Sequence, residues 1–149
     1  MRETAILSAI VFLISLGCLS AQPAKAQKSQ QVILAGYKQK PPVHTSGSGM
    51  VTVTLQGDTL SIEGDFKNLI SPFSGAYLMV SIKGRGGNQL YQLKTELNEE
   101  KTGGKFPEKQ NRFTLSEGEK ELLKKGELYI NITSYDHQGG ELRGDINMY

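Results

Sequence analysis

The sequence predicts an all-β fold with one short helix, arranged as a two-sheet sandwich or a small barrel. Three observations favour this fold class. Apolar and polar residues alternate with a period of two in several segments beyond residue 50. Turns rich in Gly, Asp and Asn separate these segments. A single segment, 116–126, has a helix cap at its start and a glycine after its end.

The length and composition fit one small domain and exclude several classes of function. A chain of 149 residues suits a single domain. Its 17 Lys and Arg residues against 15 Asp and Glu give a net charge of +2. This near-balance excludes a strongly basic nucleic-acid binder, so we expect no nucleic-acid partner. The single cysteine cannot form an internal disulfide.

The first 26 residues have the order of a secretory signal peptide. Arg2 precedes an uncharged apolar segment at 5–16, and small residues follow it up to Ala26. We expect cleavage after Ala26, with Ala21 as a second candidate. Residues 27–31 are predicted to be a linker, and residues 32–149 the folded domain. The mature protein is then expected to be periplasmic or extracellular.

Cys18 lies just beyond this apolar segment and offers a second route of processing. Residues 15–18, SLGC, resemble a bacterial lipobox, in which the cysteine is lipidated and becomes the new N-terminus. Ser15 stands where lipoboxes usually have an aliphatic residue. Ordinary cleavage and a lipid anchor at Cys18 both stay open. We expect no membrane contact other than this anchor.

Alternation predicts the strands of the domain in order. Residues 51–56 and 60–66 alternate on either side of Gly57-Asp58 and predict a β-hairpin, in which Gly64 marks a bulge or a close backbone approach. Further strands are predicted at the following places: 76–83 with Leu78, Val80 and Ile82 on one face, 89–97 after a glycine-rich loop at 84–88, 128–134 with Leu128, Ile130 and Ile132 inward, and 141–148.

Two other segments have a different character. Residues 98–112 are rich in Lys, Glu and Gly, which predicts an exposed excursion. Ser116 and Glu119 have the spacing of a capping box, and Leu122 and Leu123 give the following helix an apolar side. Gly126 is expected to end that helix.

Both ends of the predicted domain carry a family pattern. The start has Leu34-Ala35-Gly36 and Pro41-Pro42-Val43, while residues 126–132 (GELYINI) and 141–146 (ELRGDI) form the end. Together they resemble a chordin-type (CHRD) domain across nearly all of residues 32–146. The resemblance implies an immunoglobulin-like antiparallel β-sandwich in an exported protein and a module without catalytic activity.

The chain departs from this family at three positions. The family typically carries histidines where this sequence has Tyr77, Met79 and Thr133. If their strands are neighbours, these positions cluster on the face opposite the core. A histidine trio there can hold a metal, whereas a phenol, a thioether and a hydroxyl make a poor site for zinc or copper(II). We therefore predict no metal and no cofactor.

The same outward face is the candidate binding site. Tyr77, Met79, Asn131 and Thr133, together with Tyr129, are larger and more apolar than a solvent-facing surface requires. They form either a shallow binding face or a surface covered by the 98–112 segment or the helix.

Other candidate motifs have structural interpretations. His44 and His137 lack a second ligand at metal-binding spacing, and no nucleophile–base motif is present. The Arg143-Gly144-Asp145 tripeptide falls inside a predicted strand, where Glu141, Arg143 and Asp145 fit a charge ladder better than an adhesion loop.

These observations predict a non-enzymatic exported module that binds a protein or glycan partner or has a structural role. The alternative is a β-sandwich protein that binds copper or zinc, with or without redox activity.

Overall fold

The computed structural model describes residues 25–149. The predicted signal segment up to residue 24, with Cys18, lies outside the described residues. Within them, the fold is antiparallel β with one α-helix, which confirms the predicted class. None of the described helices is long and apolar enough to cross a membrane.

The elements follow one another from Gln27 to Asp145. The strands are β1 (Gln27–Ala35), β2 (Ser48–Gln56), β3 (Thr59–Lys67), β4 (Phe73–Ile82), β5 (Arg85–Gln92), β6 (Glu96–Leu97), β7 (Gly104–Phe106), β8 (Arg112–Thr114), β9 (Leu128–Ser134) and β10 (Leu142–Asp145). The helix α1 spans Glu117–Lys124, and the 3-10 turns η1 and η2 span Gly36–Lys38 and Glu108–Gln110.

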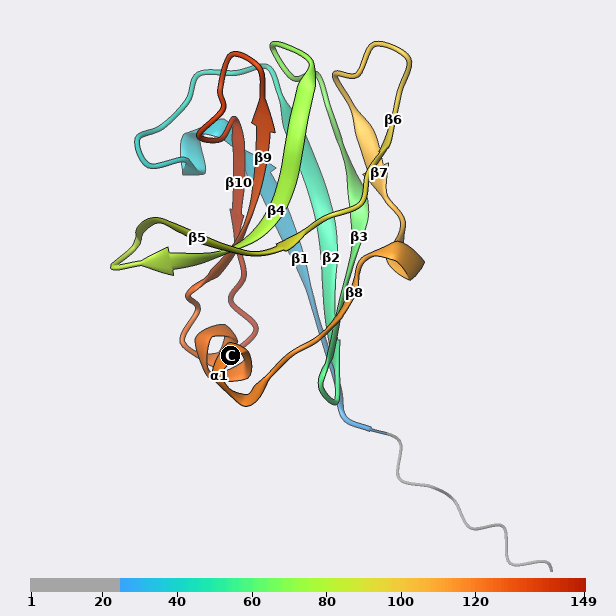
Figure 1. Cartoon of the computed structure of the whole chain (residues 1–149), viewed down its shortest axis with the longest axis vertical. Coiled ribbons are helices and arrows are strands. Elements are labelled where there is room, and N and C mark those ends of the chain that lie inside the picture. The colour runs from blue at the N-terminus through green and yellow to red at the C-terminus, as the bar shows by residue number, and fades with distance from the viewer. Residues whose placement is uncertain (1–24) are drawn as a thin grey trace, which may run out of the picture.

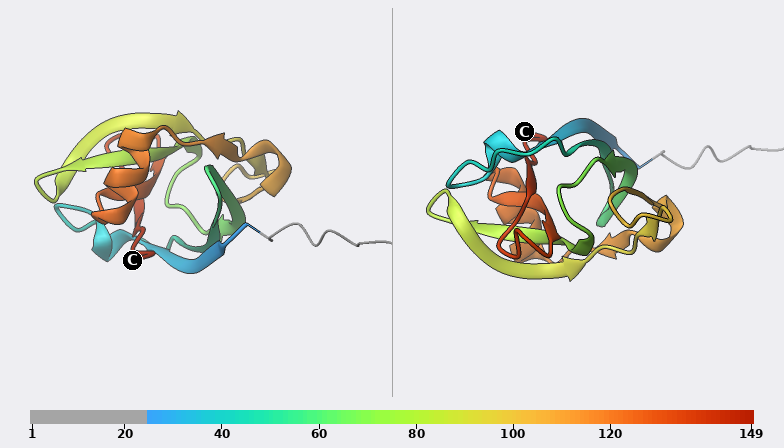
Figure 2. Two further views of the ribbon diagram at one scale, coloured as in Figure 1. Left: turned by 90° about the horizontal axis from the view of Figure 1, so that it is seen from below. Right: turned by 90° about the horizontal axis from the view of Figure 1, so that it is seen from above.

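The strands form a single curled sheet. Its order is β5-β4-β9-β10-β1-β2-β3-β7-β6, and β8 also pairs with β3. One layer, β5-β4-β9-β10, faces the layer that contains β1, β2 and β3 (Figure 1). Seen from the ends, the sheet curls round on itself, with the helix near one side (Figure 2). The layers are joined where β10 meets β1, at the pair Ala35 and Arg143.

The core lies between the inner faces of the two layers. Every second side chain of β2 and β3 is buried there, as the alternation predicted. The fully buried side chains include Leu34, Leu60, Ile62, Leu78, Ile130, Ile132 and Leu142. Removing this apolar area from water is the main driving force for the fold.

The β2–β3 hairpin confirms the prediction at Gly57-Asp58. Gly57 has a φ of 62°, a conformation that suits glycine in a two-residue hairpin turn. Gly64 pairs with Val51 in an unbroken register. A Cβ on Gly64 would lie 2.2 Å from the Met50 carbonyl oxygen, so the glycine marks a close backbone approach and not a bulge.

The helix forms as its cap predicted. Ser116 accepts a hydrogen bond from the Glu119 amide, and the Glu119 carboxylate accepts one from the Ser116 amide. Partial burial raises the pKa of Glu119, but hydrogen bonds from Ser116 and Tyr91 outweigh it and hold the pKa below its ordinary value. Leu123 is buried in the core, and Gly126 follows the helix with a positive φ.

Two segments that were predicted to lie outside strands belong to strands. Residues 27–31, predicted as a linker, form the first half of β1. They pair with β2, beginning with Gln27 opposite Gln56. Residues 85–88 of the predicted loop belong to β5, which begins at Arg85 after a turn with positive φ at Lys83 and Gly84. Ile82 was predicted to share a face with Leu78 and Val80, but a register shift lies between Val80 and Ile82, and Ile82 is 49% exposed.

The segment 98–112 is also more ordered than predicted. It contains β7 and η2, and β8 begins at its end. Phe106 is 2% exposed and packs on Phe66 of β3, with ring centroids 5.4 Å apart. Asn111 is fully buried, accepts from the Lys94 amide and donates to the carbonyls of Lys94 and Pro107. The Asn111 side chain therefore links the backbone at Lys94 to that at Pro107, as a peptide group would. The polar composition of the segment gave no sign of this role.

Candidate functional site

Strand pairing brings the predicted site residues onto one face. In β4 and β9, Tyr77 is opposite Asn131, Met79 is opposite Tyr129, and Thr133 is opposite Gly75. The alternate residues of both strands, such as Leu78 and Ile130, lie in the core. Because side chains alternate across a strand, the site residues share the outer face of this layer.

Asn131 and Thr133 are not available to a partner. They are 4% and 6% exposed. Asn131 accepts a hydrogen bond from the Gln39 side chain at 2.8 Å and donates to the Gly139 carbonyl at 3.2 Å. Thr133 Oγ1 lies 2.8 Å from Ser74 Oγ and donates to the Gly75 carbonyl. Both residues therefore fix the surrounding segments and do not form a contact surface.

Tyr77 and Met79 keep partial access to solvent. Both are half-buried on β4. The ring of Tyr77 lies on the backbone of Gly75, where a Cβ would come within 2.3 Å of the phenolic oxygen. Glycine at position 75 thus makes room for the ring to lie along the sheet. The accessible part of the candidate face consists of these two side chains, which we call the Tyr77–Met79 surface.

The segments that cover the rest of the face differ from those expected. Gln39, which follows η1, and the Gly139-Gly140 turn cover Asn131. The 98–112 segment instead lies beside β3, at the far end of the strand order. The helix contributes Leu123 to the core.

A charged cluster continues the face toward β10. Arg143 is 2% exposed and donates two hydrogen bonds to Asp145 Oδ1, at 2.9 and 2.8 Å. Its Cζ atom lies 3.7 Å from the centroid of the Tyr129 ring, a cation–π contact. The Tyr129 hydroxyl accepts a hydrogen bond from the Gly87 amide. The tripeptide 143–145 thus has the structural role expected of it, since Arg143 is not displayed on a loop.

Glu141 does not join this pair in a charge ladder. It is fully buried and accepts hydrogen bonds from Thr45, Ser134 and the Ile70 amide, the last at 2.9 Å. Its two oxygens therefore fasten the segment before β2 and the segment before β4 to the β9–β10 turn. The sequence shows a carboxylate at position 141, but its hydrogen-bond partners could not be predicted from it.

The histidines show no geometry of a metal site. His44 is exposed, and His137 lies in a turn where its amide donates to the Ser134 carbonyl at 3.1 Å. Among residues 25–149, no group of three or more His, Cys, Asp and Glu side chains is placed to hold a metal ion.

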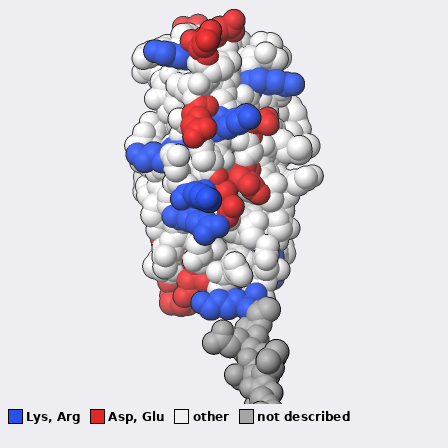
Figure 3. Space-filling view, turned by 90° about the vertical axis from the view of Figure 1, so that its right-hand side faces the viewer, with Lys and Arg blue, Asp and Glu red and all other residues white. Residues whose placement is uncertain are grey.

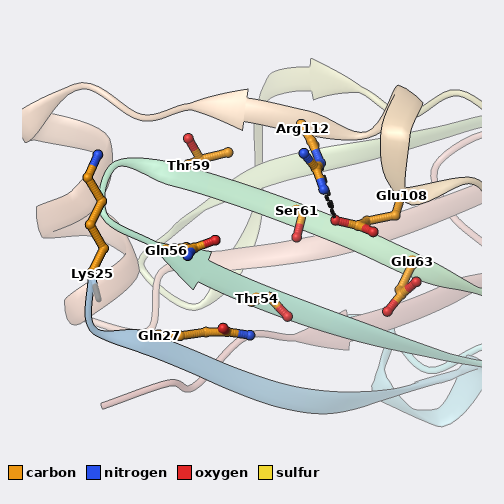
Figure 4. A pocket seen from close by; sticks show the side chains of 9 residues that line it. All are labelled: Lys25, Gln27, Thr54, Gln56, Thr59, Ser61, Glu63, Glu108 and Arg112. Carbon is orange, nitrogen blue, oxygen red and sulfur yellow. Dashed lines mark hydrogen bonds and ion pairs between the residues drawn. The ribbon is translucent and has the colours of Figure 1, made fainter. Parts of the chain in front are cut away.

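A polar hollow lies on the outer face of the other layer. Its volume is about 390 Å³, and its lining is polar: Gln27, Thr54, Gln56, Thr59, Ser61, Glu63, Glu108, Arg112 and Lys25 (Figure 4). Arg112 and Glu108 form an ion pair at its edge. No aromatic side chain lines this hollow, so it offers mainly hydrogen bonds.

The fold and this face define a class of protein, a compact all-β module with a partly covered outer surface on one layer. The model of the CHRD domain matches residues 30–146, and the chain belongs to the CHRD domain family. This family suggests an extracellular or periplasmic binding module. Neither the curated proteins nor the solved structures contain a match to the chain.

Proposed function

We propose that the protein is a non-enzymatic, exported binding module of the cell envelope or the extracellular space. Its CHRD domain supports this role, and the apolar segment and small residues before Gln27 support export. The observation that carries the proposal is the Tyr77–Met79 surface, which stays accessible above neighbours whose hydrogen bonds are made within the protein.

The chemistry of this surface fits a protein or glycan partner. A tyrosine ring and a thioether offer polarisable apolar area, and the tyrosine hydroxyl adds a hydrogen bond. The ring lies along the sheet over Gly75 and leaves a shallow surface instead of a deep cavity. Small molecules usually bind in concave pockets that bury most of their surface, whereas a shallow apolar surface suits a larger, extended partner.

The hydrogen bonds beneath the surface favour binding over catalysis. Thr133 Oγ1 is committed to Ser74 and to the Gly75 carbonyl, and no imidazole or carboxylate touches it in the described structure. Activating a hydroxyl needs such a base within hydrogen-bond reach. We therefore assign Asn131 and Thr133 the role of holding the face in shape.

Capture of partners from an envelope extract tests this function. The full-length chain is immobilised as wild type, as Tyr77→Ala/Met79→Ala, and as Tyr135→Ala/Met50→Ala. The last variant is a matched control because Tyr135 and Met50 are 63% and 50% exposed elsewhere. We expect recovery of the partner to fall by about tenfold, or about 1.4 kcal/mol, only with the first variant.

Two results would contradict the proposal. Equal recovery with both double variants would remove the Tyr77–Met79 surface as the binding site. Stoichiometric copper or zinc in protein purified without a histidine tag would favour the metal-binding alternative.

A further inference from the structure

We propose that a hollow beside β10 binds an acidic polysaccharide, a chain of sugars that carry carboxylates. The hollow has a volume of about 710 Å³ and lies between the segment 37–42 and the start of β5. Tyr37, Lys38, Lys40 and Arg85 are among its lining residues. This inference goes beyond the proposed function, because the hollow is a second site whose residues lie outside the Tyr77–Met79 surface.

The wall formed by residues 37–42 is held firmly in place. A Cβ on Gly36 would lie 2.3 Å from the Val43 carbonyl oxygen and 3.3 Å from that of Glu141, so only glycine allows this close approach. Gln39 is 8% exposed, and its side chain donates to Asn131 at 2.8 Å. The backbone between the two lysines is therefore fixed to β9, and the hollow exists before any ligand arrives.

The opposite wall is tied to the same layer. The amide of Gly87, two residues after Arg85, donates to the Tyr129 hydroxyl at 3.1 Å. The β4–β5 hairpin is paired with β9 through β4. Both walls are thus anchored on β9, which limits the reorganisation that binding requires.

The hollow carries an excess of positive charge. Three cationic side chains line it, Lys38, Lys40 and Arg85, against the single carboxylate of Asp145. Asp145 is already paired with Arg143, and none of the ion pairs among residues 25–149 includes the three lining cations. An anionic ligand would supply the charge that the protein does not provide.

Two other regions of the surface lack this imbalance. On the side of the molecule with β6, β7 and β8, positive and negative side chains are interspersed (Figure 3). The polar hollow on β1–β3 has Glu63 and Glu108 beside Lys25 and Arg112, which balances its charge (Figure 4). The excess at the 37–42 segment continues to Lys83 and Arg85 at the β4–β5 turn, and it is a local feature because the whole chain has a net charge of only +2.

The hollow also offers apolar contacts of the kind that sugar rings use. Tyr37 is 69% exposed, and Pro41 and Pro42 lie on the same wall. A pyranose ring presents C–H groups on its faces, and these pack on an aromatic ring or on proline. Asp145 Oδ1 takes both hydrogen bonds from Arg143, which leaves Oδ2 as an acceptor for a sugar hydroxyl.

The combination favours a carboxylated sugar chain over other anions. An exposed aromatic ring and two prolines add apolar contact area that a bare phosphate or sulfate would not use. The acceptor oxygen of Asp145 repels such dense anions but suits hydroxyl groups. A polyuronate has carboxylates, hydroxyls and apolar ring faces in every unit, and so matches all three features.

Binding of the full-length chain to polygalacturonate tests the inference, with dextran as the neutral polymer. The pocket variant is Lys38→Ala/Lys40→Ala/Arg85→Ala. The control is Lys67→Ala/Lys105→Ala/Lys109→Ala, which removes the same charge from exposed lysines on β3, β7 and η2. We expect the wild type to bind polygalacturonate and not dextran. The pocket variant should lose about tenfold or more in affinity, and the control less than about twofold.

Tyr37→Ala separates ring packing from charge. It should weaken binding by about threefold or more while leaving the salt dependence unchanged, because it removes no charge. Thermal unfolding and circular dichroism of each variant confirm that the fold is intact.

Several results would overturn the inference. These are equal losses in the pocket and control variants, binding of dextran as tight as that of polygalacturonate, and tighter binding of poly-glutamate or single-stranded DNA than of the polyuronate. The capture experiment with Tyr77→Ala/Met79→Ala is run in parallel. If the wild type does not bind polygalacturonate but the capture experiment gives its expected result, only the polysaccharide inference is refuted. If the two double variants also recover the partner equally, the binding function at the Tyr77–Met79 surface is refuted as well.

Discussion

The ion pair between Arg143 and Asp145 should be much more sensitive to the loss of its acid than to the loss of its base. The side chain of Arg143 is 3% exposed, whereas that of Asp145 is 35% exposed. Neutralising Asp145 leaves a buried guanidinium beside Tyr129, while removing Arg143 leaves a carboxylate that water can reach.

The expected magnitudes follow from this geometry. Two hydrogen bonds reach Asp145 Oδ1 from Arg143, and a hydrogen bond to a charged partner contributes about 1 kcal/mol more than one to a neutral partner. Asp145→Asn should therefore lower the free energy of unfolding by about 2 kcal/mol. Arg143→Met keeps most of the apolar volume and should cost about 1 kcal/mol or less, since a buried ion can be replaced by a hydrophobic side chain at little loss.

Urea unfolding at pH 7, followed by far-UV circular dichroism because the chain lacks tryptophan, measures both values. The control is the exposed pair Arg112 and Glu108, whose side chains are 55% and 39% exposed. Arg112→Met and Glu108→Gln should each change stability by less than about 0.5 kcal/mol. If Arg143→Met costs as much as Asp145→Asn, or if the two pairs respond alike, burial does not govern this interaction.

Three further predictions concern stability, pH and processing. Asn111→Ala removes three buried hydrogen bonds and should cost about 3 kcal/mol in urea unfolding, against less than about 0.5 kcal/mol for exposed Asn88→Ala; equal values would contradict the bridge. The lowered pKa of Glu119 stabilises the fold above pH 4.5, its ordinary value, and this contribution is lost as the pH falls through the folded pKa. The stability difference between wild type and Glu119→Gln should therefore shrink in acid, and a constant difference would refute this origin. Mass spectrometry of the exported protein should find Gln27 at the N-terminus; a fatty-acid-labelled chain that begins at Cys18 would instead establish the lipid anchor.

Local sequence determined the elements whose cause lies within a few residues. Alternation over 51–56 and 60–66 places every second side chain in the core, because a strand has two faces. The capping box at Ser116 and Glu119 starts the helix where the spacing predicted, since both partners lie within one turn. The shared face of Tyr77, Met79 and Thr133 followed from the same parity, once β4 and β9 proved to be neighbours.

Other features depended on partners far away in the chain. Residues 27–31 have the polar composition of a linker, yet they form a strand because β2 supplies a hydrogen-bonding edge. Asn131 and Thr133 were predicted as contact residues, but the covering side chain of Gln39 lies 92 residues from Asn131. A local sequence pattern cannot predict that a side chain so far away in the chain covers Asn131.

The sequence by itself thus determined the all-β class, the helix, the family and the parity of the candidate face, because these depend on spacing between near neighbours. Only the tertiary structure decided which side chains stay accessible and where charge is left uncompensated. The hollow beside Lys38, Lys40 and Arg85 exists because the start of β5, the end of β10 and the segment after β1 meet in space. Lys38 and Arg85, 47 positions apart, gather there through packing that alternation alone does not encode.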